Sequence, residues 1–356
     1  MSPVVTSQTQ TAARPGAAPA EPVVSVRDLQ VRFVTREATV HAVNGVSFDL
    51  EAGSVLGILG ESGSGKSVTL RALMRLLPPR RTLIEGRVRV AGHDITAMDE
   101  AALNAVRGTE VAMIFQEPMI ALDPVFTVGE QIAETIVRHE GVSYGDAWRR
   151  AHELLEMVQI PSPARRLKAY PHEMSGGMRQ RAMIALALSC RPTVLLADEP
   201  TTALDVTVQI QIILLLRQLQ QELGMSVIFV THDVGVAVEV ADRIAVMYAG
   251  RFVETGPTEA VIDSPAHPYT AGLLASTVLG SVRGQRLEAI PGMPPDLRAL
   301  PQGCPFAPRC RYAEDRCRAA MPPEFQVAPD HMTRCLRVGQ GEIDLAGPSL
   351  SERAVL

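Results

Sequence analysis

The stretch GESGSGKS, residues 60–67, indicates the fold more strongly than any other part of the chain. It matches the pattern G-x-x-x-x-G-K-[S/T] at every defined position. The apolar run SVLGIL precedes it, as expected of a buried strand. After it, apolar residues recur at helical spacing up to a pair of prolines that should end the helix: Leu70, Leu73, Met74, Leu77, Pro78 and Pro79. Strand, glycine loop and helix in this order predict backbone N–H groups and a helix N-terminus arranged around phosphate.

Within this loop, each residue type suits one part of a nucleotide. We expect Lys66 to reach the terminal phosphates and the Ser67 hydroxyl to bind magnesium. The alternative, a glycine-rich turn with an incidental lysine, is disfavoured by the two flanking elements. The predicted nucleotide-binding residues of the loop are Gly60, Glu61, Ser62, Gly63, Ser64, Gly65, Lys66, Ser67 and Val68.

A second acidic motif completes the predicted site. TVLLADE, residues 193–199, is an apolar run typical of a parallel strand covered on both faces, and it ends in two carboxylates. We expect Asp198 to hold magnesium and Glu199 to polarise the water that attacks the terminal phosphate. The alternative is a solvated acidic strand end, which is less favoured beside Lys66.

Length and composition limit the classes of protein to consider. The 356 residues are 46% apolar and 21% charged, enough for a full core and a second small module. A net charge of -5 gives no reason to expect nucleic acid as a partner. The longest apolar run, 182–197, is broken by Arg191 and Pro192, so no membrane span of about 20 residues is predicted. The first 21 residues lack a signal-peptide pattern and suggest a disordered tail on a cytosolic protein.

A third motif connects the chain to a family. In YPHEMSGGMRQRAMIALAL, residues 170–188, the residues Ser175, Gly176 and Gly177 directly precede a helical pattern and again suggest a helix N-terminus that meets an anion. Here the sequence resembles the nucleotide-binding subunits of ABC transporters, whose signature is close to L-S-G-G-Q-R-Q-R. Met174 and Met178 replace the Leu and the Gln of that signature.

Four more positions resemble that family and carry its expected roles. Phe33 occupies the place of the ring that stacks on adenine, and Gln116 that of the glutamine that senses magnesium. Asp205 resembles the aspartate that communicates across a dimer, and His232 the histidine that contacts the terminal phosphate. An isolated histidine after a strand is more often structural, but the motifs occur together in the family order.

The resemblance implies an α/β P-loop NTPase fold with a RecA-like core, an N-terminal β subdomain and a helical signature subdomain at about 117–180. It also implies that Lys66 of one subunit faces Ser175 of another, so the chain should pair with itself or with a related ATPase to enclose two ATP molecules. In the helical arm, EPMIALDPVFTVGEQI, residues 117–132, is the expected contact with a membrane subunit through Met119, Leu122 and Phe126. Trp148, Ala151, Leu155 and Val158 form an apolar stripe expected to pack internally.

Two segments near the C-terminus resemble one branch of this family. SPAHPYTAGLL, 264–274, and IPGMPPDL, 290–297, resemble the ATPases of importers for peptides, glutathione, opines and nickel. The implied partners are two permeases and an external binding protein, at the cytoplasmic face of the inner membrane. A soluble ABC ATPase acting on nucleic acid or ribosomes is the rival from another class, and the cargo remains open. The expected divisions are a disordered tail at 1–22, an ATPase domain at 23–263, an extension at 264–338 and a flexible tail at 339–356.

Four of the five cysteines gather in this extension. Cys304, Cys310, Cys317 and Cys335 have the spacing C-x5-C-x6-C-x17-C, which lacks the C-x2-C pairs common in structural zinc sites. Spacing leaves a [4Fe-4S] cluster, a zinc ion and free packed thiols open. The peptide-importer resemblance favours the cluster as ligand set, with Arg309, Arg311 and Arg316 offsetting thiolate charge. Its loss is expected to harm the extension before ATP chemistry. Cys190 is expected to be packed core.

Overall fold

The computed structural model describes residues 21–202, 204–277 and 289–345. The predicted tails fall largely outside these ranges, at 1–20 and 346–356. None of the described helices is long and apolar enough to cross a membrane.

An eight-stranded sheet forms the centre of the molecule, in the order β11-β12-β10-β9-β3-β8-β7-β6. Its five neighbouring strands from β9 to β6 run parallel, and β3, β8, β7 and β6 are buried along their whole length. Burial on both faces explains their nearly uninterrupted apolar sequences. The strands of this part are β3 (Val55–Leu59), β6 (Val111–Ile114), β7 (Val194–Asp198), β8 (Ser226–Thr231) and β9 (Arg243–Tyr248).

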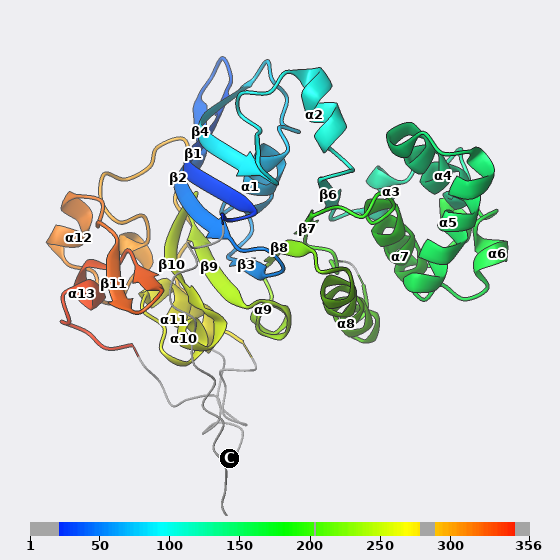
Figure 1. Ribbon diagram of the computed structural model, residues 1–356. Helices are drawn as coiled ribbons and strands as arrows, with labels where there is room; N and C mark the ends of the chain where they lie inside the picture. Colours follow the sequence, from blue (N-terminus) through cyan, green and yellow to red (C-terminus); the bar gives the residue numbers. More distant parts are fainter. Residues whose placement is uncertain (1–20, 203, 278–288, 346–356) are drawn as a thin grey trace, which may run out of the picture.

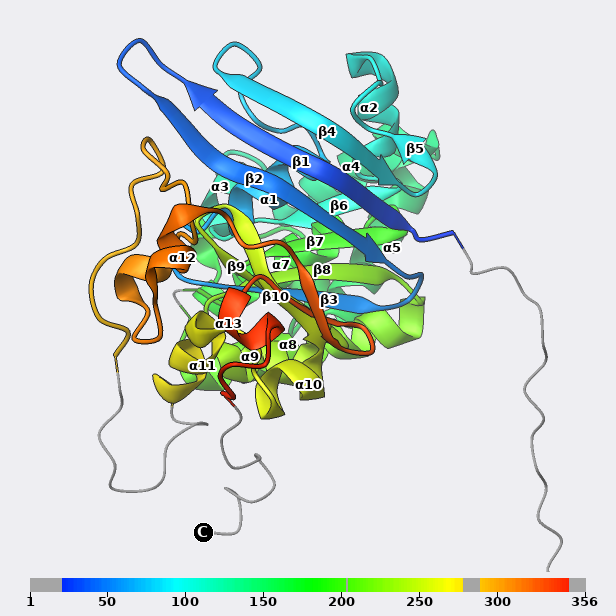
Figure 2. The ribbon, with the colours of Figure 1, turned by 90° about the vertical axis from the view of Figure 1, so that its left-hand side faces the viewer.

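A four-stranded antiparallel sheet, in the order β2-β1-β4-β5, lies over one end of the central sheet (Figure 2). Its strands are β1 (Val24–Val34), β2 (Thr39–Leu50), β4 (Thr82–Val90) and β5 (His93–Asp94), with α2 (Glu100–Val106) beside them. Helix α1 (Lys66–Leu73) packs in the core between the two sheets, because Leu70 and Leu73 are fully buried there. The predicted continuation of α1 to Leu77 is wrong: the helix ends at Leu73, and Arg75 adopts a left-handed backbone, although Leu77 remains buried.

Five helices form a separate lobe (Figure 1). They are α3 (Pro118–Ala121), α4 (Val128–Glu140), α5 (Tyr144–Met157), α6 (Pro163–Arg166) and α7 (Gly176–Ala187), with a 3-10 turn at Pro171–Glu173. The Thr127 side chain and Glu130 cap α4 reciprocally, and Ser143 caps α5. Ala151, Leu155 and Val158 are fully buried, as the stripe predicted, whereas Trp148 is half-buried against the same core.

Two expectations about individual side chains need correction. Leu122, expected to face a partner, is 1% exposed and packs in the lobe's core, whereas Met119 and Phe126 are exposed at 43% and 48%. Cys190, expected in the core, lies beyond the end of α7 and is half-buried, although burial raises the pKa of its thiol.

The C-terminal third packs against the core rather than standing apart from it. Its elements after β9 are β10 (Arg251–Pro257), α10 (Thr258–Asp263), α11 (Pro268–Ala275), a 3-10 turn at Ala307–Arg309, α12 (Asp315–Ala319), β11 (Phe325–Ala328), β12 (His331–Thr333) and α13 (Leu336–Gly339). Strand β12 pairs with β10 and so extends the central sheet. The buried Glu254 carboxylate lies 2.8 Å from His331 Nε2, which ties the two strands together.

An aromatic cluster joins this extension to the core. The Phe306 ring lies 5.3 Å from the Tyr248 ring and 5.4 Å from the Tyr269 ring, and it is 3% exposed. Tyr248 ends β9, so this cluster seats the extension at the end of an interior strand of the central sheet. Helices α8 (Val206–Leu223) and α9 (Val234–Val240) cover other parts of the sheet.

Candidate nucleotide site and cysteine site

The glycine loop runs from the end of β3 to the start of α1, as predicted. Gly65 has φ 109° and Gly63 has φ 78°, a backbone region that side chains rarely adopt. At Gly60 the constraint is space, because a Cβ there would lie 2.3 Å from the carbonyl oxygen of Met247. The glycines therefore permit both the turn and its close contact with β9.

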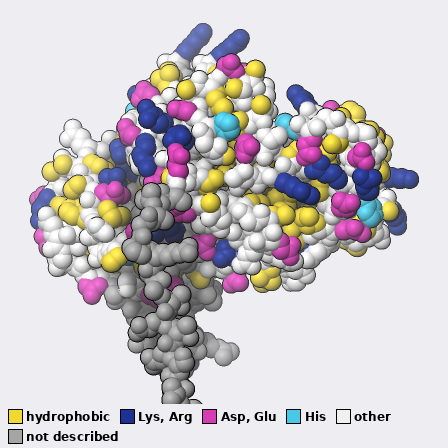
Figure 3. Space-filling model, viewed as in Figure 1, with side chains coloured by type: hydrophobic (Ala, Val, Ile, Leu, Met, Phe, Trp, Pro, Cys, Tyr) yellow, Lys and Arg dark blue, Asp and Glu magenta, His cyan; other side chains and the backbone are white. Residues whose placement is uncertain are grey.

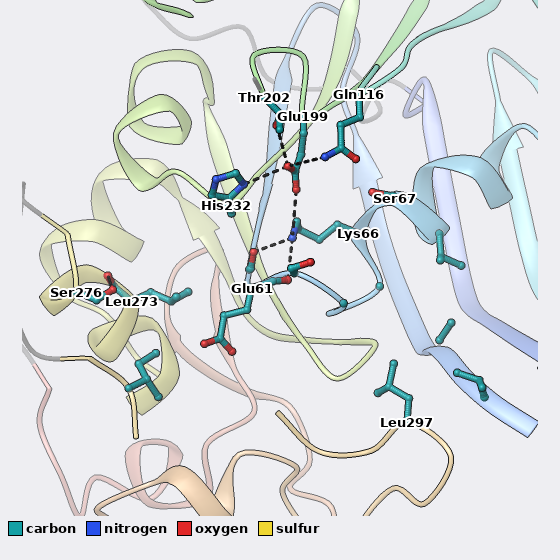
Figure 4. A pocket seen from close by; sticks show the side chains of 18 of the residues that line it. Glu61, Lys66, Ser67, Gln116, Glu199, Thr202, His232, Leu273, Ser276 and Leu297 are labelled. Atoms are coloured by element: carbon teal, nitrogen blue, oxygen red, sulfur yellow. Dashed lines mark hydrogen bonds and ion pairs between the residues drawn. The ribbon is translucent and has the colours of Figure 1, made fainter. Parts of the chain in front are cut away.

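The Lys66 side chain curls back over this loop (Figure 4). Its Nζ donates to the carbonyl oxygens of Gly60 at 2.7 Å and Glu61 at 2.9 Å, and it lies 3.8 Å from Glu199 Oε1. Burial lowers the pKa of Lys66, with the nearby carboxylates acting in the opposite direction. The ammonium group is thus held inside the loop that phosphate groups would occupy.

Ser67 and Asp198 form a second pair at the start of α1. The Ser67 hydroxyl donates to Asp198 Oδ1 at 2.6 Å. The other oxygen, Oδ2, is buried without a hydrogen bond, and its nearest cation is the Arg71 guanidinium at 3.7 Å. Burial raises the pKa of Asp198. A hydroxyl and an incompletely paired buried carboxylate are hard oxygen ligands of the kind that magnesium prefers.

Several side chains of the site contact the Glu199 carboxylate. Its Oε2 lies 3.0 Å from Thr202 Oγ1, 3.2 Å from His232 Nδ1 and 3.5 Å from Gln116 Nε2 (Figure 4). Its backbone has φ 45°, which is uncommon for a residue other than glycine. With Lys66, four side chains from separate points in the sequence therefore surround one carboxylate. Thr202 was not predicted, although it lies three residues after Glu199.

A cleft of about 950 Å³ opens over these groups. Phe33 and Val40 of the antiparallel sheet line one part of it. Leu273, Ile290 and Leu297 of the C-terminal extension line another, and the His41 amide donates to the Leu297 carbonyl at 2.9 Å. Sequence reasoning missed this contribution, because nothing in the motif spacing relates residues 273–297 to the glycine loop.

The signature residues lie elsewhere. Ser175 caps α7, accepting from the Met178 amide at 3.3 Å, with Gly176 and Gly177 in the first turn. Asp205 caps α8 by accepting from the Val208 amide at 3.0 Å. Neither the three signature residues nor Asp205 lines the cleft over the glycine loop.

The cysteine site lies within the extension. Cys304, Cys310, Cys317 and Cys335 line one small pocket together with apolar residues of the same segment. Backbone amides donate to three of the sulfur atoms: those of Phe306 and Ala307 to Cys304, that of Tyr312 to Cys310, and those of Arg337 and Val338 to Cys335. Among the described residues, no group of three or more His, Cys, Asp or Glu side chains is placed to hold a metal ion.

Burial favours the neutral form of three of these thiols. It raises the pKa of Cys304 to about 11 and also raises the pKa of Cys310 and Cys335. Arg337, which the sequence did not single out, is the nearby cation that acts against this rise at Cys310 and Cys335.

The predicted role of the other arginines as thiolate partners is wrong for two of the three. The Arg309 guanidinium pairs with Glu61 of the glycine loop, and the Arg316 guanidinium pairs with Glu314 and Glu342. Arg311 lies over the Tyr312 ring, 5.2 Å from its centroid.

Comparisons with known proteins agree with this architecture. Residues 43–202 match the ABC transporter family, and residues 253–317 match the oligopeptide/dipeptide transporter C-terminal region. A dimeric ATP-binding cassette solved in a post-hydrolysis state with ADP and Pi aligns with a TM-score of 0.60 and 30% identity, covering 66% of this chain and 98% of its own.

Named relatives match over almost nine-tenths of the chain. A putative peptide import ATP-binding protein of Brucella melitensis is 49% identical over 329 residues, 89% of this chain and 97% of that protein. The oligopeptide transport ATP-binding protein of Bacillus subtilis is 49% identical over 314 residues, 88% of each chain. The chain belongs to the family of ATP-binding subunits of oligopeptide and dipeptide ABC transporters.

Proposed function

We propose that this chain hydrolyses ATP to drive the import of peptides through a membrane transporter, with Glu199 as the residue that polarises the attacking water. The convergence of Thr202, His232 and Gln116 on one Glu199 oxygen carries this proposal. A carboxylate held by several donors is fixed in place, as a group that must orient a water requires.

The remaining roles follow from position. Lys66 exchanges its bonds to loop carbonyls for the terminal phosphates of ATP, and the loop amides from Gly60 to Val68 surround the phosphate chain. Ser67 and Asp198 hold magnesium, with Gln116 beside it, and His232 contacts the terminal phosphate. Phe33 lines the cleft at the side where the adenine ring would stack.

The working ATPase is a pair of subunits. Ser175 and Asp205 do not line this chain's own cleft, so a second ABC ATPase, either another copy or a related chain, supplies a signature helix N-terminus to the phosphates. The similar cassette with ADP and Pi is described as a dimer, which supports this arrangement. ATP then favours the closed pair because it contacts both subunits only in that state.

The helical lobe contacts the membrane subunits. Met119, Ile120, Val125 and Phe126 are exposed apolar residues around α3, directly after Gln116 in sequence. Hydrophobic side chains are visible where the lobe meets the core (Figure 3). Such an exposed patch is typical of an interaction site. Binding there to two permease subunits, which an external binding protein supplies with substrate, places the chain at the cytoplasmic face of the inner membrane.

The cysteine site holds a metal group, for which we propose [4Fe-4S]. Four thiols around one pocket, with backbone amides aimed at the sulfur atoms, fit such a cluster. A zinc ion at the same four thiols is the alternative. Anaerobic purification followed by visible absorption and by iron and zinc analysis decides between them. Reduced thiols with neither metal would refute both.

The transport proposal is tested in membranes. The chain is expressed with the permeases and binding protein encoded beside its gene, and ATP hydrolysis is measured in vesicles with dipeptides, longer peptides, glutathione, opines or nickel. We expect peptides to stimulate hydrolysis. Stimulation by nickel, glutathione or opines alone would keep the ATPase role and change the cargo. A chain that never associates with the permeases and instead binds RNA at physiological salt would be a soluble ABC ATPase.

A further inference from the structure

The C-terminal extension makes a direct ionic contact with the glycine loop. The Arg309 Nη1 lies 2.7 Å from Glu61 Oε2, and Nη2 lies 3.0 Å from Glu61 Oε1, a two-point guanidinium–carboxylate pair. Glu61 occupies the second position of GESGSGKS, and its carbonyl oxygen is one of the two that hold Lys66. The pair therefore connects the cysteine segment to a residue of the phosphate-binding loop.

The contact is built into the structure rather than formed by two free surface side chains. The Arg309 side chain is 4% exposed, and its remaining donors bond the Pro291 carbonyl at 2.9 Å and the Tyr248 hydroxyl at 3.3 Å. Glu61 is held from a second side as well, because its amide donates to the Tyr269 hydroxyl at 2.9 Å. Side chain and backbone of Glu61 are thus both fixed by residues that belong to the extension.

We propose that Arg309 is a positioning residue of the nucleotide site, and that the extension, through Arg309 and Tyr269, holds the glycine loop in the conformation that binds ATP. Arg309 does not line the nucleotide cleft. It acts through the side chain of Glu61, a residue whose backbone carbonyl holds Lys66. The backbone amides expected to bind phosphate lie in the same short loop as the Gly60 and Glu61 carbonyls that hold Lys66. Displacement of Glu61 should therefore disturb several phosphate contacts at once.

If Arg309 only positions the loop, its loss should weaken ATP binding more than it slows hydrolysis. Glu199, Gln116, Thr202 and His232 have no contact with Arg309, so the hydrolytic step at saturating ATP should change less than the affinity. For Arg309→Gln we expect the Kd for a fluorescent ATP analogue and the KM for ATP to rise about tenfold, with kcat reduced less than threefold. Arg309→Lys keeps the charge but loses the two-point geometry, so it should recover only part of the affinity.

Matched variants separate positioning from a general loss of structure. Arg316→Gln removes another arginine of the same extension, one that pairs with Glu314 and Glu342 and not with the loop, and should leave Kd unchanged. Tyr269→Phe removes only the hydroxyl that accepts from the Glu61 amide, so it should raise Kd in the same direction with little effect on folding. Thermal unfolding and metal content are measured for every variant.

A double-mutant cycle with Glu61→Gln gives the decisive readout. If Arg309 acts through Glu61, the double variant should bind the ATP analogue about as weakly as either single variant. Additive losses, or an Arg309→Gln protein that remains folded and binds ATP like the wild type, would overturn the proposal. Should Arg309→Gln fail to fold, the Tyr269→Phe and Arg309→Lys measurements decide, with unchanged Kd in both counting against it.

One consequence rests on the proposed metal site. Arg309 lies in the 3-10 turn that ends next to Cys310, so thiol ligation there fixes the same turn that carries the guanidinium. The expectation that losing the cysteine site harms the extension before ATP chemistry therefore changes, because the two effects should appear together. For Cys310→Ser we expect loss of bound iron and a raised Kd for the ATP analogue. Iron loss with unchanged Kd would separate the metal site from the loop and leave the Arg309 result standing; unchanged iron would instead count against the metal site.

Discussion

The nucleotide site and the cysteine site differ in how they hold the groups that would bind a ligand. At the nucleotide site, charges are buried beside partners that a ligand must displace: Lys66 bonds loop carbonyls, and Ser67 bonds Asp198. At the cysteine site, four thiols line one small pocket, with Cys317 and Cys335 buried and the other two half-buried. Burial raises the pKa of Cys304, Cys310 and Cys335 and so favours their neutral form. One site is arranged to bind and release its ligand, whereas the other is suited to a ligand that stays. The Arg309–Glu61 pair makes the two dependent on each other.

The largest expected effect lies at the nucleotide site. Glu199→Gln keeps the size of the side chain but removes the charge that polarises water, so kcat should fall by about 10² to 10⁴. Steady-state phosphate release gives kcat, and binding of a fluorescent ATP analogue should remain. Glu222→Gln, at the exposed end of α8, is the control. Hydrolysis near the wild-type rate would remove Glu199 from its assigned role.

The seating of the extension is tested by Phe306→Ala. Phe306 is buried between the Tyr248 and Tyr269 rings, and truncating such a residue costs about 3–5 kcal/mol. We expect urea unfolding to lose cooperativity, with the extension opening first, and proteolysis to begin between 289 and 345. Val327→Ala, on an exposed strand, is the comparison. A single unchanged transition would show that the aromatic cluster does not seat the extension.

The burial of Cys304 predicts that the stability of metal-free protein depends on pH in the alkaline range. Burial raises the pKa of Cys304 from 9.0 to about 11, so metal-free protein has this stabilisation below pH 9 and loses it as pH rises toward 11. The loss is about 1.4 kcal/mol per pH unit within that window.

Urea midpoints of metal-free protein at pH 8, 9, 10 and 11 measure this loss. Metal-loaded protein should not show it, because its sulfur atoms are already deprotonated ligands. The loss should be smaller in a metal-free Cys304→Ala variant. Equal slopes for loaded and metal-free protein would contradict an ion at these thiols.

The parts of the molecule that could be predicted from sequence are those defined within short windows. The apolar strands, the glycine loop and the acidic pair at 198–199 each carry their own pattern, and the family match over most of the chain confirms the fold class. The end of α1 at Leu73 could not be predicted, because the buried side chains continue the helical spacing after the backbone has turned.

Contacts between residues far apart in the chain could not be predicted from the sequence. Arg309 was assigned to nearby thiols because proximity in sequence was the available guide, yet its partner lies 248 positions away. Leu122 and Phe126 have the same apolar character, but lobe packing buries one and exposes the other. In both cases the side chain's chemistry was known and only its surroundings were missing.

We expect the smallest effect from breaking a second, exposed arginine–carboxylate pair, Arg27–Asp49. Arg27 Nη2 lies 2.7 Å from Asp49 Oδ2, as close as Arg309 is to Glu61, but the two side chains are 53% and 40% exposed. Water already solvates both groups of the exposed pair, so breaking it costs at most about 1 kcal/mol.

In the Arg309–Glu61 pair the side chains are only 4% and 29% exposed, and removing Arg309 leaves the Glu61 carboxylate of the glycine loop without this partner. Arg27→Gln should therefore leave the ATP analogue's Kd unchanged and shift the urea midpoint only slightly, in contrast to Arg309→Gln. Equal effects of the two substitutions would mean that burial and the link to the glycine loop add nothing to an ordinary ion pair.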